Sequence, residues 1–230
     1  MLTFQDIQKH PKILEFINQS EIALKALDYT EHGLRHAKLV AREAKNLAKQ
    51  INLSERGQDL AAIAGFCHDM GNFLGRSQHH YWGALLFHQI FSAKGESASG
   101  EKNDFTPKEL VWIMQAISNH DKDTMKLTEP ISAIVVLADK SDVHRSRVTV
   151  ESMEKIKNDI HDRVNYAVTM SDLKVNSVKK QIILTLKIDR NFVPVIEFFE
   201  IFTERMTYCR QAANYLGYKF HLVINNFKLL

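Results

Sequence analysis

One stretch constrains the fold of this chain more than any other: residues 60–71, which read LAAIAGFCHDMG. Its first eight residues are apolar on every side of a helix, a pattern typical of a helix that is buried all round. The run ends in His68 and Asp69, and an unpaired carboxylate in such surroundings costs several kcal/mol. A metal ion would accept both side chains at once and would suit the negative end of the helix dipole. The sequence therefore predicts that other segments bring further ligands to His68 and Asp69.

The composition is that of a globular protein. The chain has 230 residues, 45% hydrophobic and 25% charged, enough for one large domain or for a main domain with a smaller unit attached. Its net charge of +3 is too small to indicate a nucleic-acid or membrane surface, but it is compatible with an anionic small molecule. With only two cysteines we expect no disulfide framework. The N-terminal residues lack a targeting pattern and no run could span a bilayer, so we expect a cytoplasmic protein.

Amphipathic patterns predict helices over most of the first 150 residues. They cover residues 3–28, with a break near Pro11, and residues 31–50. His32 and His36 lie on one side of the second pattern, at the edge of its apolar stripe. Two histidines at this spacing favour a site more than one would, but they are also compatible with a packed core.

Helix boundaries are marked by capping residues. Ser54 can cap the buried helix, and Gly71 can end it in the left-handed conformation. Residues 106–109 form a capping box for a helix whose apolar face continues to His120. Pro130 begins the next buried segment, which we interpret as a helix rather than a strand because its neighbours are helical.

Two segments before residue 150 have a polar character. Residues 92–105 are small and polar and predict a loop, either a plain surface connection or a lid. Residues 140–147 are basic and are expected to be exposed.

The pattern changes after about residue 150. A helix over residues 152–168 is followed by two alternating runs, around Leu173 and over residues 182–188. A long amphipathic helix from Pro194 to about residue 217 precedes a last alternating run over residues 218–224. These elements predict a small α+β unit with a three-stranded antiparallel sheet. We therefore divide the chain into residues 1–150 and 151–230.

Potential metal ligands stand where apolar helical faces end, in separate parts of the chain. The dipeptide His-Asp is uninformative alone because the chain contains it three times, and only the copy at residues 68–69 ends a helix that is apolar all round. Together the candidates are His36, His68, Asp69, His79, His120 and Asp139.

The order His36, then His68-Asp69, then Asp139 resembles the HD superfamily of metal-dependent phosphohydrolases. The segments EHGLRHA (residues 31–37), HDMG (68–71) and LADK (137–140) carry this resemblance, which covers about residues 28–150. Members with two metals add two histidines, the first of which is separated from a following Gly-Ala by three intervening residues. His79, unlike His80, has that relation to Gly83-Ala84, and His120 follows a helix as the second one does. The set is similar to that of the bacterial dinucleoside-tetraphosphate hydrolases of the superfamily.

The resemblance implies a mainly α fold, an HD-domain helical bundle that holds one or two divalent transition-metal ions. Imidazoles with carboxylates suit iron or manganese, with zinc, cobalt or nickel as alternatives. Asp69 would be the catalytic bridging ligand that orients a metal-bound hydroxide toward phosphorus.

The expected substrate is a small anionic phosphate ester or anhydride, in particular a nucleotide; we expect no nucleic acid or membrane partner and leave a homodimer open. The resemblance leaves two alternatives, a di-iron oxygenase and a non-catalytic nucleotide-sensing module. The role of residues 151–230 is open. Residues expected to bind the substrate phosphates are His32, Arg76, Lys140, Arg145 and Arg147.

Overall fold

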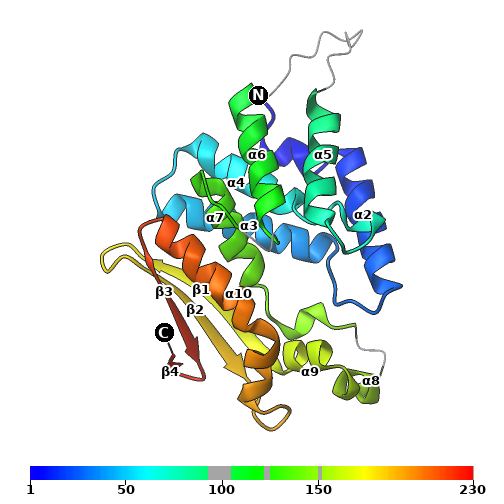
Figure 1. Cartoon of the computed structure of the whole chain (residues 1–230), viewed down its shortest axis with the longest axis vertical. Helices are drawn as coiled ribbons and strands as arrows, with labels where there is room; N and C mark the ends of the chain where they lie inside the picture. Colours follow the sequence, from blue (N-terminus) through cyan, green and yellow to red (C-terminus); the bar gives the residue numbers. More distant parts are fainter. Residues whose placement is uncertain (93–104, 122–124, 150–151, 230) are drawn as a thin grey trace.

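The computed structural model describes residues 1–92, 105–121, 125–149 and 152–229, and most of these are helical (Figure 1). Most of the segment 92–105, predicted as a loop, lies outside the described residues. The mainly α fold agrees with the prediction. The elements are α1 (Phe4–Ile7), α2 (Pro11–Lys25), α3 (Leu34–Gln50), α4 (Glu55–Cys67), η1 (Asn72–Leu74), α5 (His79–Ser92), α6 (Pro107–Asn119), α7 (Pro130–Lys140), η2 (Arg145–Arg147), α8 (Met153–Asn158), α9 (Ile160–Ala167), β1 (Val168–Asn176), β2 (Gln181–Ile188), α10 (Val195–Tyr215), β3 (Lys219–Ile224) and β4 (Phe227–Lys228).

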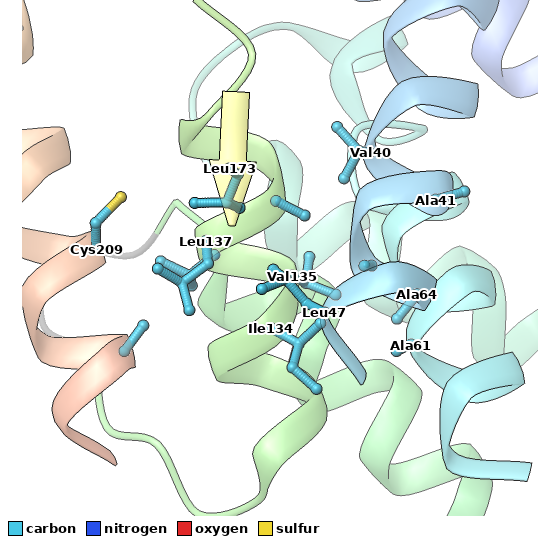
Figure 2. Close-up of a cluster of buried hydrophobic side chains, with 14 of the residues drawn as sticks. Val40, Ala41, Leu47, Ala61, Ala64, Ile134, Val135, Leu137, Leu173 and Cys209 are labelled. Atoms are coloured by element: carbon cyan, nitrogen blue, oxygen red, sulfur yellow. The ribbon is translucent and has the colours of Figure 1, made fainter. Parts of the chain in front are cut away.

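Helices α3, α4 and α7 form the centre of the bundle. Small residues let α3 and α4 approach closely, since a Cβ on Gly65 would lie 3.2 Å from the carbonyl oxygen of Val40. Figure 2 shows four buried residues of these two helices: Val40 and Ala41 of α3, and Ala61 and Ala64 of α4. Every residue of α7 from position 131 to 140 is buried, and the prediction of a helix there is confirmed.

The contact between the end of α4 and the start of α5 depends on two glycines. We expected Gly71 to end α4 in the left-handed conformation, but its φ of −84° is right-handed, so that prediction is wrong. A Cβ on Gly71 would lie 2.1 Å from the carbonyl oxygen of His79 and 2.5 Å from the amide nitrogen of Gly83. Glycine is needed here for the close approach of two backbones, not for its conformation.

The C-terminal sheet differs from the predicted one. It has four strands in the order β1-β2-β3-β4 and is mixed, because β2 pairs in parallel with β3. The crossover through α10 is the cause, since a long helix returns the chain to the end of the sheet where β2 began. A further strand, β4, follows the two-residue turn of Asn225 and Asn226, both with positive φ.

The helix predicted over residues 152–168 is divided in two. Asp159 adopts an extended conformation between α8 and α9, and its side chain accepts a hydrogen bond from the amide of Asp162 to cap α9. This capping bond competes with the continuation of the helix. None of the helices in the described part of the chain is long and apolar enough to cross a membrane.

Candidate metal centre

Helices α3 to α7 bring the predicted ligands to one buried cluster. Asp69, directly after α4, lies at its middle. One carboxylate oxygen of Asp69, Oδ2, lies 3.2 Å from His68 Nε2 and 3.6 Å from His36 Nε2. The other oxygen, Oδ1, lies 3.1 Å from His79 Nε2 and 3.4 Å from His120 Nε2. A pair of imidazoles therefore faces each oxygen of this carboxylate.

A second carboxylate, that of Asp139, faces the imidazole pair of His36 and His68 and forms a first group of ligands with them. Its Oδ1 lies 3.3 Å from His36 Nε2 and 3.6 Å from His68 Nε2. The second group is Asp69, His79 and His120, whose donor atoms all lie within 4.8 Å of one another. Among the described residues it is His79, not His80, that contributes to such a group. The structure thus brings together all six predicted ligands.

Each of the four imidazoles is held by a hydrogen bond on its far side. His68 and His120 follow the last residues of α4 and α6, and their Nδ1 atoms donate to the carbonyl oxygens three residues earlier, at 2.8 Å and 2.7 Å. His79 Nδ1 donates to the Arg76 carbonyl oxygen at 2.9 Å. His36 Nδ1 lies 2.7 Å from a carboxylate oxygen, that of Asp142. Such outer contacts fix ring orientation in metal sites.

These contacts provide a test of whether the cluster fits a cation. A carbonyl oxygen only accepts, so the rings bonded to carbonyls carry a proton on Nδ1 and, when neutral, present a lone pair on Nε2. The Nε2 atoms of His36 and His68 lie 3.1 Å apart, and those of His79 and His120 lie 3.0 Å apart. Two lone pairs at that distance repel unless a cation or a proton lies between them. The donor set therefore fits divalent metal ions.

The charges of the cluster support the same conclusion. Burial opposes a charge on His68, but the carboxylates of Asp69 and Asp139 outweigh it and raise the pKa of His68 to about 10. Burial lowers the pKa of His120 to about 4, so this ring is neutral. Burial also opposes the charge of Asp69, yet its imidazole neighbours, His68 first, hold the pKa of that carboxyl well below its usual range. A bound cation would replace the proton that the carboxylates attract to His68.

Two of the basic residues expected to bind substrate lie against the cluster. Arg76 Nη1 lies 3.1 Å from His79 Nε2, and Arg76 Nη2 donates to Asp121 Oδ2 at 2.6 Å. Lys140 Nζ donates to Asp121 Oδ1 at 3.0 Å and to Asp139 Oδ2 at 2.8 Å. Asp121 therefore joins the two cations at the edge of the cluster.

The expectation that residues 140–147 are exposed is wrong for most of the segment, since residues 140–143 and Arg147 are buried, residues 144 and 145 are half-buried and Ser146 is exposed. The side chains of Lys140 and Arg147 are each 2% exposed, because α10 and β1 enclose this end of α7. Arg147 donates to the backbone oxygen of Glu31 at 3.2 Å and so supports the loop before α3. Arg145 lies over the ring of Tyr166, 5.2 Å from its centroid. The structure does not bring Arg145 or Arg147 to the metal ligands.

His32, the remaining residue of the predicted substrate set, is buried beside the cluster. Its ring centroid lies 5.6 Å from that of His36, and its Nδ1 contacts the carbonyl oxygen of Thr30. Burial, with a smaller effect of Arg147, lowers the pKa of His32 well below its usual value, so this ring is neutral. It can offer a hydrogen bond to a ligand, but not a charge.

Asp142 is a supporting residue that the sequence analysis missed. Besides fixing His36, its Oδ2 accepts a hydrogen bond from Arg35 Nη2 at 2.8 Å. Burial opposes its charge, but His36 and Arg147 outweigh burial and hold the pKa of this carboxyl well below its usual range. A usable signal was present, since Asp142 follows Asp139 by three residues, about one helical turn.

Two comparisons with known proteins gave matches. A family model described as "HD domain" matches residues 29–144. An uncharacterized protein of Methanocaldococcus jannaschii, MJ1020, is 25% identical over 175 residues, which is 70% of this chain. The match covers 66% of that relative's own length. The matched family segment contains every residue of the cluster.

Proposed function

The chain belongs to the HD domain family, and we propose that it is a metal-dependent phosphohydrolase that cleaves a phosphate ester or anhydride, in particular that of a nucleotide. One observation carries this proposal. The buried carboxylate of Asp69 lies between two pairs of imidazoles, with one oxygen toward each pair. That arrangement suits a carboxylate shared by two cations, which is a common plan for phosphoryl hydrolysis.

The residues would divide between two ions. His36, His68 and Asp139 would hold one, His79 and His120 would hold the other, and Asp69 would contact both. Iron or manganese fits this mixture of imidazole and carboxylate, with zinc, cobalt or nickel as alternatives. When bound, such ions lower the pKa of water and polarise a phosphoryl oxygen.

The remaining contribution of the protein is orientation and charge. The hydrogen bonds on the far side of each ring keep the Nε2 lone pairs aimed inward. Arg76 and Lys140 add positive charge at the edge of the cluster, where a phosphate would approach. Both cysteine thiols are buried, and burial raises the pKa of Cys209 to about 12 and that of Cys67 further. This supports water, rather than a protein thiol, as the nucleophile.

Metal analysis joined to a phosphate-release screen tests the proposal. The protein would be purified under nitrogen, its metals counted per chain, and its phosphate release measured over nucleotides and simple phosphate esters. We expect one or two transition-metal ions per chain and phosphate release that ends when the metal is chelated. Absence of bound metal together with metal-independent hydrolysis would contradict the proposal.

Three variants make the experiment specific. Asp69→Ala should remove both metals, whereas His120→Ala should remove one, because the two oxygens of Asp69 face different imidazole pairs and His120 belongs to one pair. His88→Ala is the matched control, since His88 lies on α5 but is exposed. Its metal content and activity should equal those of the wild type.

Two other outcomes would replace the proposal. Oxygen uptake by the ferrous protein, without phosphate release under nitrogen, would identify an oxygenase that uses the same ligands. Nucleotide binding that Asp69→Ala abolishes, without turnover by the wild type with any metal, would identify a sensing module.

A further inference from the structure

Helix α10 packs along α7, the helix whose next-to-last residue is the cluster residue Asp139 (Figure 1). Figure 2 shows Cys209 of α10 facing Leu137 of α7. Arg205 precedes Cys209 by four residues, so it lies on the same side of α10, one turn away. This side of α10 belongs to the part of the chain that the family match, residues 29–144, does not cover.

The charge of Arg205 acts on the edge of the metal centre. Its guanidinium lies within electrostatic range of two acids, Asp139 and Asp121, and of the cations Arg147 and Arg76. Lys140, beside Asp139, is also within its range. Of these groups, Asp139, Asp121, Arg76 and Lys140 form the side of the cluster where Arg76 and Lys140 meet.

Neither acid is available to neutralise Arg205. Asp139 already accepts a hydrogen bond from Lys140, and Asp121 accepts one each from Lys140 and Arg76. Within the described part of the chain Arg205 forms no ion pair; its contact is with the ring of Phe202, 5.0 Å from the centroid.

The surroundings make this unpaired charge unfavourable. Burial, with the repulsion of Arg147, lowers the pKa of Arg205, although an arginine remains charged. A partly buried cation without a counter-ion costs free energy, and an arriving anion would recover it. A guanidinium matches phosphate oxygens with two parallel hydrogen bonds.

We propose that Arg205 is a substrate-binding residue of the metal centre, which α10 supplies to a phosphate group of the substrate. This inference rests on the proposed phosphohydrolase function and gives residues 151–230 a role in it. Arg205 adds a positive charge that has no acidic partner among the described residues, so it favours substrates with more negative charge than a single phosphodiester.

Binding of inorganic phosphate and pyrophosphate to the metal-loaded protein tests this inference without turnover. Equilibrium dialysis would compare the wild type with Arg205→Gln, Arg205→Lys and Arg210→Gln, with metal counted in each sample. Arg210 is the matched control because it lies on α10 but is exposed and lines a groove with Leu222 and Leu229.

We expect Arg205→Gln to weaken binding of at least one anion by about 10- to 100-fold, the usual range for one charged hydrogen-bonding partner. Arg205→Lys should recover part of the loss, and Arg210→Gln should bind like the wild type. If Arg205→Gln weakens binding of both anions, Arg205 contacts the phosphate group that lies at the metals. If it weakens binding of pyrophosphate alone, Arg205 contacts the second phosphate group, next to the one at the metals. Unchanged affinity for both anions, with unchanged metal content, would overturn the inference.

Kinetics separate this inference from the proposed function. If the wild type hydrolyses a phosphate compound, Arg205→Gln should raise KM by a similar factor and leave kcat within about twofold, which a merely structural role would not do. If no compound is hydrolysed but anion binding depends on Arg205, the phosphohydrolase proposal fails and the binding role stands. Loss of metal or of the folded state in Arg205→Gln, with no recovery in Arg205→Lys, would assign Arg205 a structural role instead.

Discussion

Replacing Gly71 with alanine should displace the start of α5 and with it the ligand His79. The φ of −84° at Gly71 suits any residue, so the cost is steric alone. The added Cβ would lie 2.1 Å from the carbonyl oxygen of His79, about 0.9 Å short of the 3.0 Å below which real Cβ contacts essentially never occur. Because the atoms it meets are backbone, the whole segment has to move.

The magnitude follows from this geometry. Overpacking costs about 1–3 kcal/mol, and a clash with backbone belongs at the upper end of that range. For a domain of this size about 3 kcal/mol lowers the melting temperature by about 6–12 °C. A shift of about 1 Å is also enough to remove a ligand from a metal. We therefore expect the Gly71→Ala variant to lose the metal ion that His79 and His120 would hold.

Thermal melts of the metal-free protein and metal counts per chain measure the two effects. Gly83→Ala is a milder control on the other side of the same contact, since its Cβ would meet the Ile117 side chain at 3.2 Å. Gly75→Ala controls for backbone strain, because Gly75 has a φ of +113° and a ψ of 161° with no atom within 4 Å of the added Cβ, and it should cost about 1–3 kcal/mol. A melting temperature for Gly71→Ala within 2 °C of the wild type, with full metal content, would refute this reasoning.

Further perturbations test other parts of the structure. Asp142→Asn should weaken metal binding by about 10- to 100-fold in a competition titration, because it weakens the hydrogen bond that orients a ligand. Chelation of the metal should lower the melting temperature, and metal at about 100 times its Kd should restore about 2.7 kcal/mol. The bond from Arg56, at 2.6 Å, holds the pKa of Glu109 below its usual range, so the pair stabilises the fold above the ordinary glutamate pKa of about 4.3 and loses that effect as the pH falls. In denaturant titrations, Glu109→Gln should therefore destabilise the metal-free protein at pH 7 and have little effect near pH 3. The thiols of Cys67 and Cys209 should react with a thiol reagent only on unfolding.

Five of the six ligands were readable from the sequence because they stand where an apolar helical face ends; the sixth, His79, was chosen from the resemblance to the HD superfamily. A polar group in that position needs a partner, and in a compact bundle the ends of buried helices meet. The interpretation of Pro130 as a helix start rested on the same kind of local rule. Such signals depend on the residue and its immediate neighbours, which the sequence contains.

The misjudged features depend on contacts between distant segments. Gly71 was assigned a conformational role because its steric partners, near His79 and Gly83, are not its neighbours in sequence. The alternation in residues 218–224 predicts a strand but not its direction, which the α10 crossover determines. Lys140 was expected at the surface because basic residues usually lie there, yet two carboxylates compensate its burial.

The contacts of β1 and α10 show why the unit after residue 150 matters for the metal centre. Ser171 of β1 donates to the carbonyl oxygen of Ser141 at 2.6 Å, directly after α7, and Cys209 of α10 faces Leu137 within the same hydrophobic core. One continuous hydrophobic core includes residues of the bundle and of the sheet. Cutting the chain at residue 150 would therefore expose the side of α7 that is opposite α3 and would free the segment that carries Asp139. The division of the chain into two domains at residue 150 stays a prediction from the sequence pattern. The packing indicates that the α+β unit supports the metal ligands, and the same unit contains Arg205.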